Sequence, residues 1–487
     1  MIPQHNLYYI NKITTALPAV LALLFFSCGS GSGGQKNSIA TDSVVVSKSL
    51  YNEKLIAGAL IDSIPCRAQT SNTYALYLPS YYTSSKKFPC IYLFDAHARG
   101  SLAINAYKKL SEKYGFVLIG SYFSKNGIPW QAVNEAVKTL MDDTRVRINI
   151  DPQRIYTAGF SGGARVASTI AIVNGGIAGV IGCAAGFPQL EQQVANKFDY
   201  FGMAGLYDFN LPEMELLDNM LAQNGFTHQL LTLTGTHGWA PVADFETALL
   251  WLQVNAMKKS TQQKNDTITA SLKNDYLRRI AAATNSGNWV TACQLLTGMV
   301  QSLDGLIDVT DYKRQLTALT ASNKYKEAQA MATTIRQTEQ NQQNELARQF
   351  TLQDEQWWVT KINALNKKAK TIAEEQMNKR LINYIGLVGY MNITHALNAG
   401  DLTHVPTFIN IFKLAGPHNP DCSYLLAIYY IKTGDKQKAI AALQSAAASG
   451  YSEVATIISS PELSNLQSDP AFKYILEQIK DNSKGVN

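Results

Sequence analysis

The sequence predicts an α/β fold, in which a doubly wound, mostly parallel sheet is followed by an all-α region of helical repeats. Three observations lead to this fold class. Short apolar runs alternate with amphipathic helical patterns from residue 51 to about residue 258, a polar stretch then breaks the pattern, and helical periodicity alone continues to the end. Strands covered on both faces read as short apolar runs, and their alternation with helices is typical of parallel sheets.

Strands and helices of the first region can be placed from these runs. The predicted strands are Tyr74–Leu78, Cys90–Phe94, Phe116–Gly120, Arg154–Ala158, Val180–Ala184, Tyr200–Ala204 and Gln229–Leu233. The predicted helices are Ala103–Tyr114, Trp130–Thr144, Gly163–Ile172, Leu211–Asn224 and Val242–Met257. We therefore expect a complete sheet domain over residues 51–258, which needs no other part of the chain.

The polar stretch Lys258–Asp266 predicts a linker with few contacts, and residues 259–487 form the helical domain. A turn of Gly or Asn, followed five residues later by Ala or Val, recurs there at positions 287, 323, 400 and 434. Two of the three spacings between these turns approach the 34-residue tetratricopeptide period, and the long one contains extra helix. The segment around Gly434 also resembles one tetratricopeptide unit, with Ala427, Ala439 and Ala446 where two helices would touch. We expect tetratricopeptide-like repeats that offer a surface to a protein partner.

The N-terminus predicts export and a lipid anchor. An apolar run, Thr14–Phe26, follows Lys12 and ends just before Cys28. It is shorter than the roughly 20 residues that span a bilayer and has the length of a signal-peptide core. A cysteine in this place resembles a bacterial lipoprotein signal, which implies cleavage before Cys28 and lipidation of its thiol. An ordinary cleaved signal is the alternative.

The resulting plan is a signal with its lipidated cysteine over residues 1–28, a flexible tether over 29–50, and the two domains. The tether begins with a Gly/Ser run at residues 29–34. The predicted location is the cell envelope, at the periplasmic or the surface face of the outer membrane.

Bulk composition excludes some function classes. Hydrophobic residues make up 46% of the 487 positions, which suffices for a large core. The net charge is +6, and no run of Lys or Arg resembles a nucleic-acid patch, so nothing in the charge indicates nucleic-acid binding. The six cysteines are scattered without paired spacing, so we expect neither a metal site nor a dense disulfide framework. Cys66 and Cys90 are expected to be buried free thiols, although a disulfide between them is the alternative in an oxidising compartment.

One motif indicates a nucleophile. Residues 159–163 read Gly-Phe-Ser-Gly-Gly, which matches G-x-S-x-G between a predicted strand and a predicted helix. In that context a sharp turn lifts the serine hydroxyl above the sheet, and glycines on both sides permit the turn. The sequence therefore predicts Ser161 as the nucleophile of a hydrolase.

A nucleophilic serine needs a base and an acid that orients the base. Asp208 follows the strand predicted at Tyr200–Ala204, and His237 follows the one at Gln229–Leu233, within a Gly-Thr-His-Gly loop. Their order, serine, acid, histidine, suits this kind of strand-to-helix turn. We expect Ser161, Asp208 and His237 to form a catalytic triad. Two other acids, Asp218 and Asp244, are the alternatives for the acid, but both fall within helical patterns.

The oxyanion hole is expected to use the backbone N–H of Gly162, which follows the nucleophile, and a second N–H from the loop after the strand Cys90–Phe94. That loop reads Asp-Ala-His-Ala-Arg-Gly, and either Ala96 or His97 can supply the donor. The side chain of His97 can contact substrate or have a structural role, and the sequence leaves both open.

Residues 150–163 (IDPQRIYTAGFSGG), with the Gly-Thr-His-Gly-Trp loop at 235–239, resemble the polyhydroxybutyrate depolymerase and feruloyl/acetylxylan esterase branch of the α/β-hydrolases. The resemblance covers residues 70–257. It implies hydrolysis of small-molecule or polymer-borne carboxylic esters through an acyl-enzyme, without a cofactor, and structural roles for Asp151 and Arg154. The Asp-Ala-His-Ala-Arg-Gly loop departs from the His-Gly-Gly run of such enzymes, which leaves the shape of the acyl pocket open.

Two alternatives to an esterase remain at this point. A peptidase of the same fold uses the same triad. A binding lipoprotein, with working repeats and a vestigial hydrolase domain, is the other, but a triad in the right order argues against it.

Overall fold

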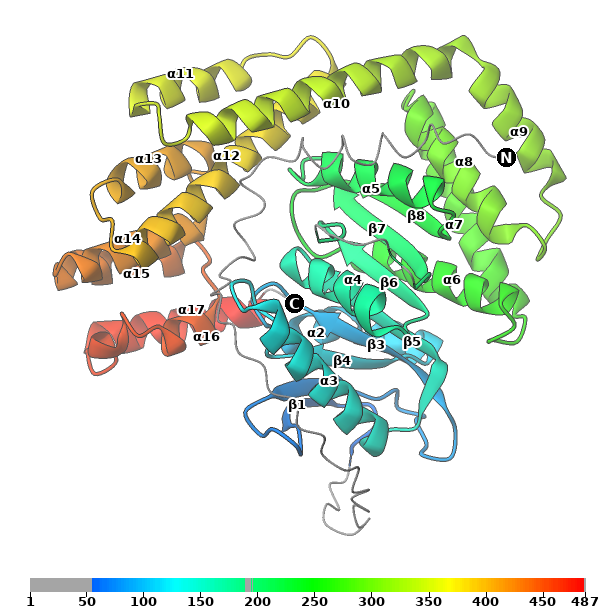
Figure 1. Ribbon diagram of the computed structural model, residues 1–487, viewed down its shortest axis with the longest axis horizontal. Helices are drawn as coiled ribbons and strands as arrows, with labels where there is room; N and C mark the ends of the chain where they lie inside the picture. The colour runs from blue at the N-terminus through cyan, green and yellow to red at the C-terminus, as the bar shows by residue number, and fades with distance from the viewer. Residues whose placement is uncertain (1–54, 189–193, 195, 486–487) are drawn as a thin grey trace, which may run out of the picture. The chain divides into compact units, whose positions relative to one another are not determined.

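The computed structural model describes residues 55–188, 194 and 196–485. Eight strands form one mixed sheet in the order β1-β2-β4-β3-β5-β6-β7-β8 (Figure 1). Strand β2 runs antiparallel to both β1 and β4, whereas β3 is parallel to β4, and β6, β7 and β8 are parallel to one another. The strands are β1 Leu60–Pro65, β2 Thr73–Tyr77, β3 Phe88–Phe94, β4 Val117–Ser121, β5 Ile150–Phe160, β6 Gly179–Cys183, β7 Asp199–Gly205 and β8 His228–Leu233.

The chain divides into two compact units, one ending at Thr157 and the other beginning at Ala158, so the division falls within β5. The first unit contains β1 to β4, helix α2 (Gly100–Tyr114) and helix α3 (Trp130–Arg147). Strands β3 and β4 are buried along their whole length and form its core, as their continuous apolar sequences predict.

Strand β1 is the one strand of the described sheet that the sequence pattern does not predict. It lies at the edge, its side chains are mostly half-buried or exposed, and its pairing with β2 is irregular between Ile61 and Ile64. An edge strand lacks a neighbour on one side and needs no continuous apolar run. Its sequence, LIDSIP, therefore reads as a loop.

The second unit contains strands β6 to β8 together with helices α4 (Gly162–Asn174), α5 (Leu211–Gln223) and α6 (Val242–Lys258), which lie before, between and after them along the chain. Helix α6 is buried at every residue from Thr247 to Met257. A helix on one face of a sheet normally keeps a polar outer side. Here helices α7 (Asp266–Asn285) and α8 (Trp289–Leu303) pack against α6, and α8 also packs against β8.

Polar contacts cross from this α/β part to α7 and α8. Arg279 on α7 forms an ion pair of 2.7 Å with Asp244 on α6, and the ammonium group of Lys258 donates to the carbonyl of Gln301. A Cβ on Gly298 of α8 would lie 1.7 Å from Oε1 of Gln229 on β8, so a larger residue there would require the Gln229 side chain to shift. The structure thus differs from the expectation that few contacts cross near residue 258.

The rest of the second unit is helical: α9 Thr310–Ala321, α10 Asn323–Gln349, α11 Glu355–Leu365, α12 Ile372–Ala399, α13 Val405–Ala415, α14 Pro420–Lys432, α15 Lys436–Ala448, α16 Val454–Ser459 and α17 Pro470–Gly485. Helices from α10 onward share a core that includes Trp358, Leu381, Ile385, Phe412 and Leu443. The turns predicted at 287, 400 and 434 each lie between two helices, whereas Asn323 is the first residue of α10, directly after the break between α9 and α10. The α/β sheet followed by an all-α region is confirmed, whereas the tetratricopeptide assignment stays a prediction.

Cys66, Cys90, Cys183, Cys293 and Cys422 are free and buried, which agrees with the expectation for Cys66 and Cys90. Cys28, the signal and the tether lie outside the described residues. Within the ranges that the structure covers, no helix combines the length and the hydropathy needed to cross a membrane.

Candidate active site

Ser161 occupies a sharp turn between the end of β5 and the start of α4. Its backbone has φ 54° and ψ −121°, a conformation that costs a non-glycine residue about 1–3 kcal/mol and is typical of functional positions. Glycine at position 159 is required, because a Cβ there would lie 2.1 Å from the carbonyl oxygen of Gly163. The Ser161 N–H donates to the carbonyl of Cys183 on the neighbouring strand, 2.9 Å away, and this bond fixes the turn.

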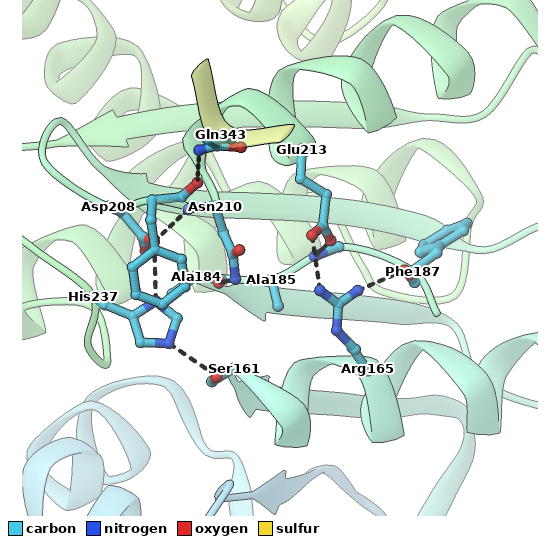
Figure 2. Close-up of polar contacts among 12 residues, drawn as sticks. Ser161, Arg165, Ala184, Ala185, Phe187, Asp208, Asn210, Glu213, His237 and Gln343 are labelled. Atoms are coloured by element: carbon cyan, nitrogen blue, oxygen red, sulfur yellow. Dashed lines mark hydrogen bonds and ion pairs between the residues drawn. The ribbon is translucent and has the colours of Figure 1, made fainter. Parts of the chain in front are cut away.

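The three predicted triad residues form one chain of hydrogen bonds (Figure 2). Nε2 of His237 lies 2.9 Å from Oγ of Ser161, and its Nδ1 lies 3.0 Å from Oδ1 of Asp208. A carboxylate only accepts hydrogen bonds, so the imidazole hydrogen is on Nδ1. Nε2 is then free to accept the proton of the Ser161 hydroxyl, which is the arrangement a general base requires.

Asp208 is completely buried. Its Oδ1 accepts hydrogen bonds from the imidazole of His237 and from the backbone N–H of Asn210, at 2.8 Å. Among the described residues its Oδ2 has no hydrogen-bond partner. Burying a carboxylate costs free energy unless the charge is paired and hydrogen-bonded. The surrounding chain must therefore hold the Asp208 side chain away from water against that cost.

Two aromatic rings hold the imidazole of His237. Phe209 stacks on it with ring centroids 4.4 Å apart and planes inclined by 26°, and Phe160 contacts it at 4.9 Å and 53°. These rings fix the plane of the base and keep water from one of its faces. Nothing in the sequence pattern indicates either contact, although Phe160 and Phe209 directly neighbour Ser161 and Asp208 in the chain.

The loops that carry Asp208 and His237 approach each other closely. A Cβ on Gly205 would lie 2.4 Å from the carbonyl oxygen of Gly235, so only glycine permits this approach. The backbone N–H of Tyr207 donates to the same carbonyl, at 2.9 Å. Glycines at these two strand ends therefore set the distance between the acid and the base.

Each alternative acid has another partner. Asp218 on α5 lies 3.4 Å from Nε2 of His228, and Asp244 on α6 pairs with Arg279. Burial raises the pKa of the Asp218 carboxyl above its usual value, although His228 opposes this effect. The geometry therefore favours Asp208 as the acid.

Residues predicted for the oxyanion hole lie in both units. Gly162 is the first residue of α4, where backbone N–H groups have no intrahelical acceptor and the helix dipole favours negative charge. In the first unit, Ala96 is buried and His97 is exposed. The backbone N–H of His97 donates to Oδ1 of Asp95 at 2.8 Å. The assignment of the oxyanion hole stays a prediction.

A buried ion pair supports the neighbourhood of the nucleophile. The guanidinium of Arg165 on α4 donates to Oε2 of Glu213 on α5 at 2.8 Å and to the carbonyl of Phe187 at 2.9 Å (Figure 2). Oε1 of Glu213 accepts from the N–H of Gly186. These contacts tie α4 to α5 and to the loop after β6. In the portion of the chain that the structure describes, no three His, Cys, Asp or Glu side chains cluster as metal ligands would.

No protein-family model matches the chain, and no curated protein matches it. Among solved structures, it is similar to the fluorophosphonate-binding serine hydrolase F (FphF) of Staphylococcus aureus, at 12% identity over 40% of this chain and 98% of that one, with a TM-score of 0.32. It is also similar to S-formylglutathione hydrolase (FrmB) of the same organism, at 13% identity over 40% of this chain and 96% of that one, with a TM-score of 0.33. A feruloyl esterase module from Clostridium thermocellum is 15% identical over 39% of this chain and 85% of its own length, with a TM-score of 0.33. These similarities concern the fold alone, over about two fifths of the chain.

Proposed function

We propose that this protein is a serine hydrolase that cleaves carboxylic esters through an acyl-enzyme. The observation that carries the proposal is the hydrogen-bonded chain from Ser161 through His237 to the buried Asp208, with the nucleophile on a strained turn. A serine, an imidazole in the right tautomer and a buried acid recur in this geometry on unrelated folds and perform acyl transfer in each.

In the first half-reaction, Oγ of Ser161 attacks the substrate carbonyl while its proton passes to Nε2 of His237. Asp208 stabilises the imidazolium that forms. The negative charge that develops on the substrate oxygen is stabilised by the backbone N–H of Gly162 at the start of α4. The tetrahedral intermediate collapses, and the alcohol leaves with the proton from His237.

In the second half-reaction, water attacks the ester between the acyl group and Ser161. Nε2 of His237 takes a proton from the water and returns it to the serine oxygen as the carboxylic acid leaves. The enzyme is thereby restored, and no group other than water is consumed. A peptidase of this fold would follow the same steps, so the preference for esters rests on the sequence resemblance and not on the triad.

A fluorophosphonate probe tests the proposal, because it phosphonylates only an activated serine. We expect the full chain to be labelled at Ser161 and the Ser161→Ala variant to remain unlabelled, as judged by mass spectrometry of the labelled peptide. A panel of acetyl, feruloyl and peptide substrates then separates esterase from peptidase. Absence of labelling in folded protein would favour the vestigial alternative.

We also propose that the protein is anchored in the cell envelope through lipid on Cys28, with residues 29–50 as the tether. Replacement of Cys28 by serine is expected to release the protein from membranes and to abolish labelling with palmitate. A single acyl chain anchors only weakly, so stable retention implies more than one chain. Equal labelling of the variant and the original protein would refute the anchor. Recruitment of a protein partner by the helical region remains part of this proposal.

A further inference from the structure

We propose that helices α10 and α12 belong to the active site, because they hold the loop from Gly205 to Asn210 (the acid loop) and thereby position Asp208 against His237. The inference rests on the proposed function and deepens it. It assigns positioning roles to Gln343, Arg380 and Asn383.

Three side chains of the helical region donate hydrogen bonds to backbone carbonyls of the acid loop. Nη1 of Arg380 donates to the carbonyl of Leu206 at 2.8 Å, and Nδ2 of Asn383 donates to that of Tyr207 at 2.7 Å. On the other side of Asp208, Nε2 of Gln343 donates to the carbonyl oxygen of residue 209 at 3.1 Å (Figure 2). The bonded carbonyls flank Asp208 on both sides, so the loop is fixed where its carboxylate must stay.

Arg380 is itself held rigidly. Its Nε and Nη2 both donate to the carboxylate of Glu339 on α10, each at 2.7 Å, and both side chains are buried. A bidentate pair fixes the plane of a guanidinium, and Nη1 is then directed at the carbonyl of Leu206. A buried ion pair adds little to stability by itself but demands one geometry. This geometry links α10, α12 and the acid loop.

Phe209 extends the contact to the base. Its ring packs against the core of the helical region and stacks on the imidazole of His237. The ammonium group of Lys379 on α12 also lies over the ring of Tyr207, 4.9 Å from its centroid. Every residue from 206 to 209, apart from Asp208 itself, is therefore in contact with α10, α12 or the core they share.

The buried acid explains why the loop needs this support. Asp208 has an oxygen without a hydrogen-bond partner among the described residues, so its charge would be better solvated if the loop moved toward water. Hydrogen bonds from Gln343 and Asn383 oppose that movement, because the movement would break them. Without these donors, the carbonyls of residues 207 and 209 would also be better solvated in water, and this would favour the movement. The helical region thus adds three hydrogen bonds to those that the α/β part makes to the same loop, which run from the N–H of Leu206 to Leu233 and from the N–H of Tyr207 to Gly235.

Another contact of α10 provides a matched control. Nε of Arg336 on α10 forms an ion pair of 2.8 Å with Glu215 on α5. Within the described part of the chain neither side chain hydrogen-bonds to the acid loop, although both charges act on the carboxyl of Glu339. Helix α10 and helix α5 are labelled in Figure 1. Loss of this pair removes one contact between the helical region and the α/β part without a direct effect on Asp208.

The test uses the full chain with the double substitution Gln343→Met and Asn383→Leu, which keeps the side-chain shapes and removes both N–H donors. We expect kcat for 4-nitrophenyl acetate to fall about 100-fold, as when a catalytic group is displaced by about 1 Å, with KM almost unchanged. The far-downfield proton resonance of the His237 Nδ1–H, which reports its bond to Asp208, should broaden or disappear. Arg336→Gln should retain the original kcat and resonance.

A folded double variant that keeps kcat and the resonance would overturn the inference, as would an equal loss of kcat in Arg336→Gln. Where the double variant does not fold, Gln343→Met alone decides, and a tenfold or larger loss of kcat with an unchanged melting temperature supports the inference, while an unchanged kcat overturns it. If the full chain shows no hydrolysis that depends on Ser161, the proposed function fails. The resonance of His237 then decides the positioning role by itself.

Discussion

Replacement of Ser161 by alanine is expected to abolish ester hydrolysis and leave the fold intact. The hydroxyl of Ser161 points toward the imidazole of His237, which is its one hydrogen-bond partner among the residues that the structure describes. His237→Ala should be nearly as severe, with a loss in kcat on the order of 10⁶, as found when such a triad loses its nucleophile or base. The double variant should lose little more than either single one, because the triad acts as a unit.

Kinetics with 4-nitrophenyl acetate, together with circular dichroism of each variant, would measure these losses. Asp208→Asn should lower kcat by about 10⁴, because an amide can hold the imidazole in the wrong tautomer. Asp218→Asn is the matched control, since Asp218 pairs with His228 and not with the base. Substantial hydrolysis by purified, folded Ser161→Ala would contradict the assignment of the nucleophile.

Removal of all residues after 259 is expected to give an insoluble protein. The sequence alone predicts the opposite, a complete and active hydrolase, but α7 and α8 cover α6 and contact β8. The side of α6 that faces α7 and α8 would lose that cover, and Asp244 would lose Arg279. An apolar face of this kind on a soluble domain leads to aggregation.

A chain that ends at residue 308 separates the two contributions of the helical region. It keeps α7 and α8 and lacks Gln343, Arg380 and Asn383. We expect this shorter chain to be soluble, with the circular dichroism of a folded α/β protein, and to hydrolyse 4-nitrophenyl acetate about 100-fold more slowly than the full chain, because its acid loop is free to move. Full activity in the chain that ends at residue 259 would disprove both parts of this prediction.

Much of the α/β part follows from local signals. The apolar runs of β3, β4 and β6 mark buried strands, and glycines at positions 159 and 163 mark the turn that exposes Ser161. Asp208 and His237 were predicted from their order and from their places after strands. Each of these signals depends on residues that lie close together in the chain, so it can be recognised in a single sequence.

Contacts between distant segments could not be predicted in this way. Gln343, Arg380 and Asn383 are ordinary residues of helical patterns, and nothing in their neighbourhood indicates a partner in the acid loop. The face that each presents depends on how α10 and α12 pack, which periodicity does not specify. Strand β1 was missed because an edge strand needs only partial burial.

The long separation along the chain between the acid loop and its donors also affects when hydrolysis can begin. Leu206 and Arg380 are 174 residues apart, and Tyr207 and Asn383 are 176 apart. Contacts of such high sequence separation carry a large loop-closure cost and belong to the late events of folding. A growing chain has its nucleophile, base and acid long before α12 is synthesised. On this view the order of synthesis delays full activity, and the growing chain reaches its full rate of hydrolysis only after α12 has been made.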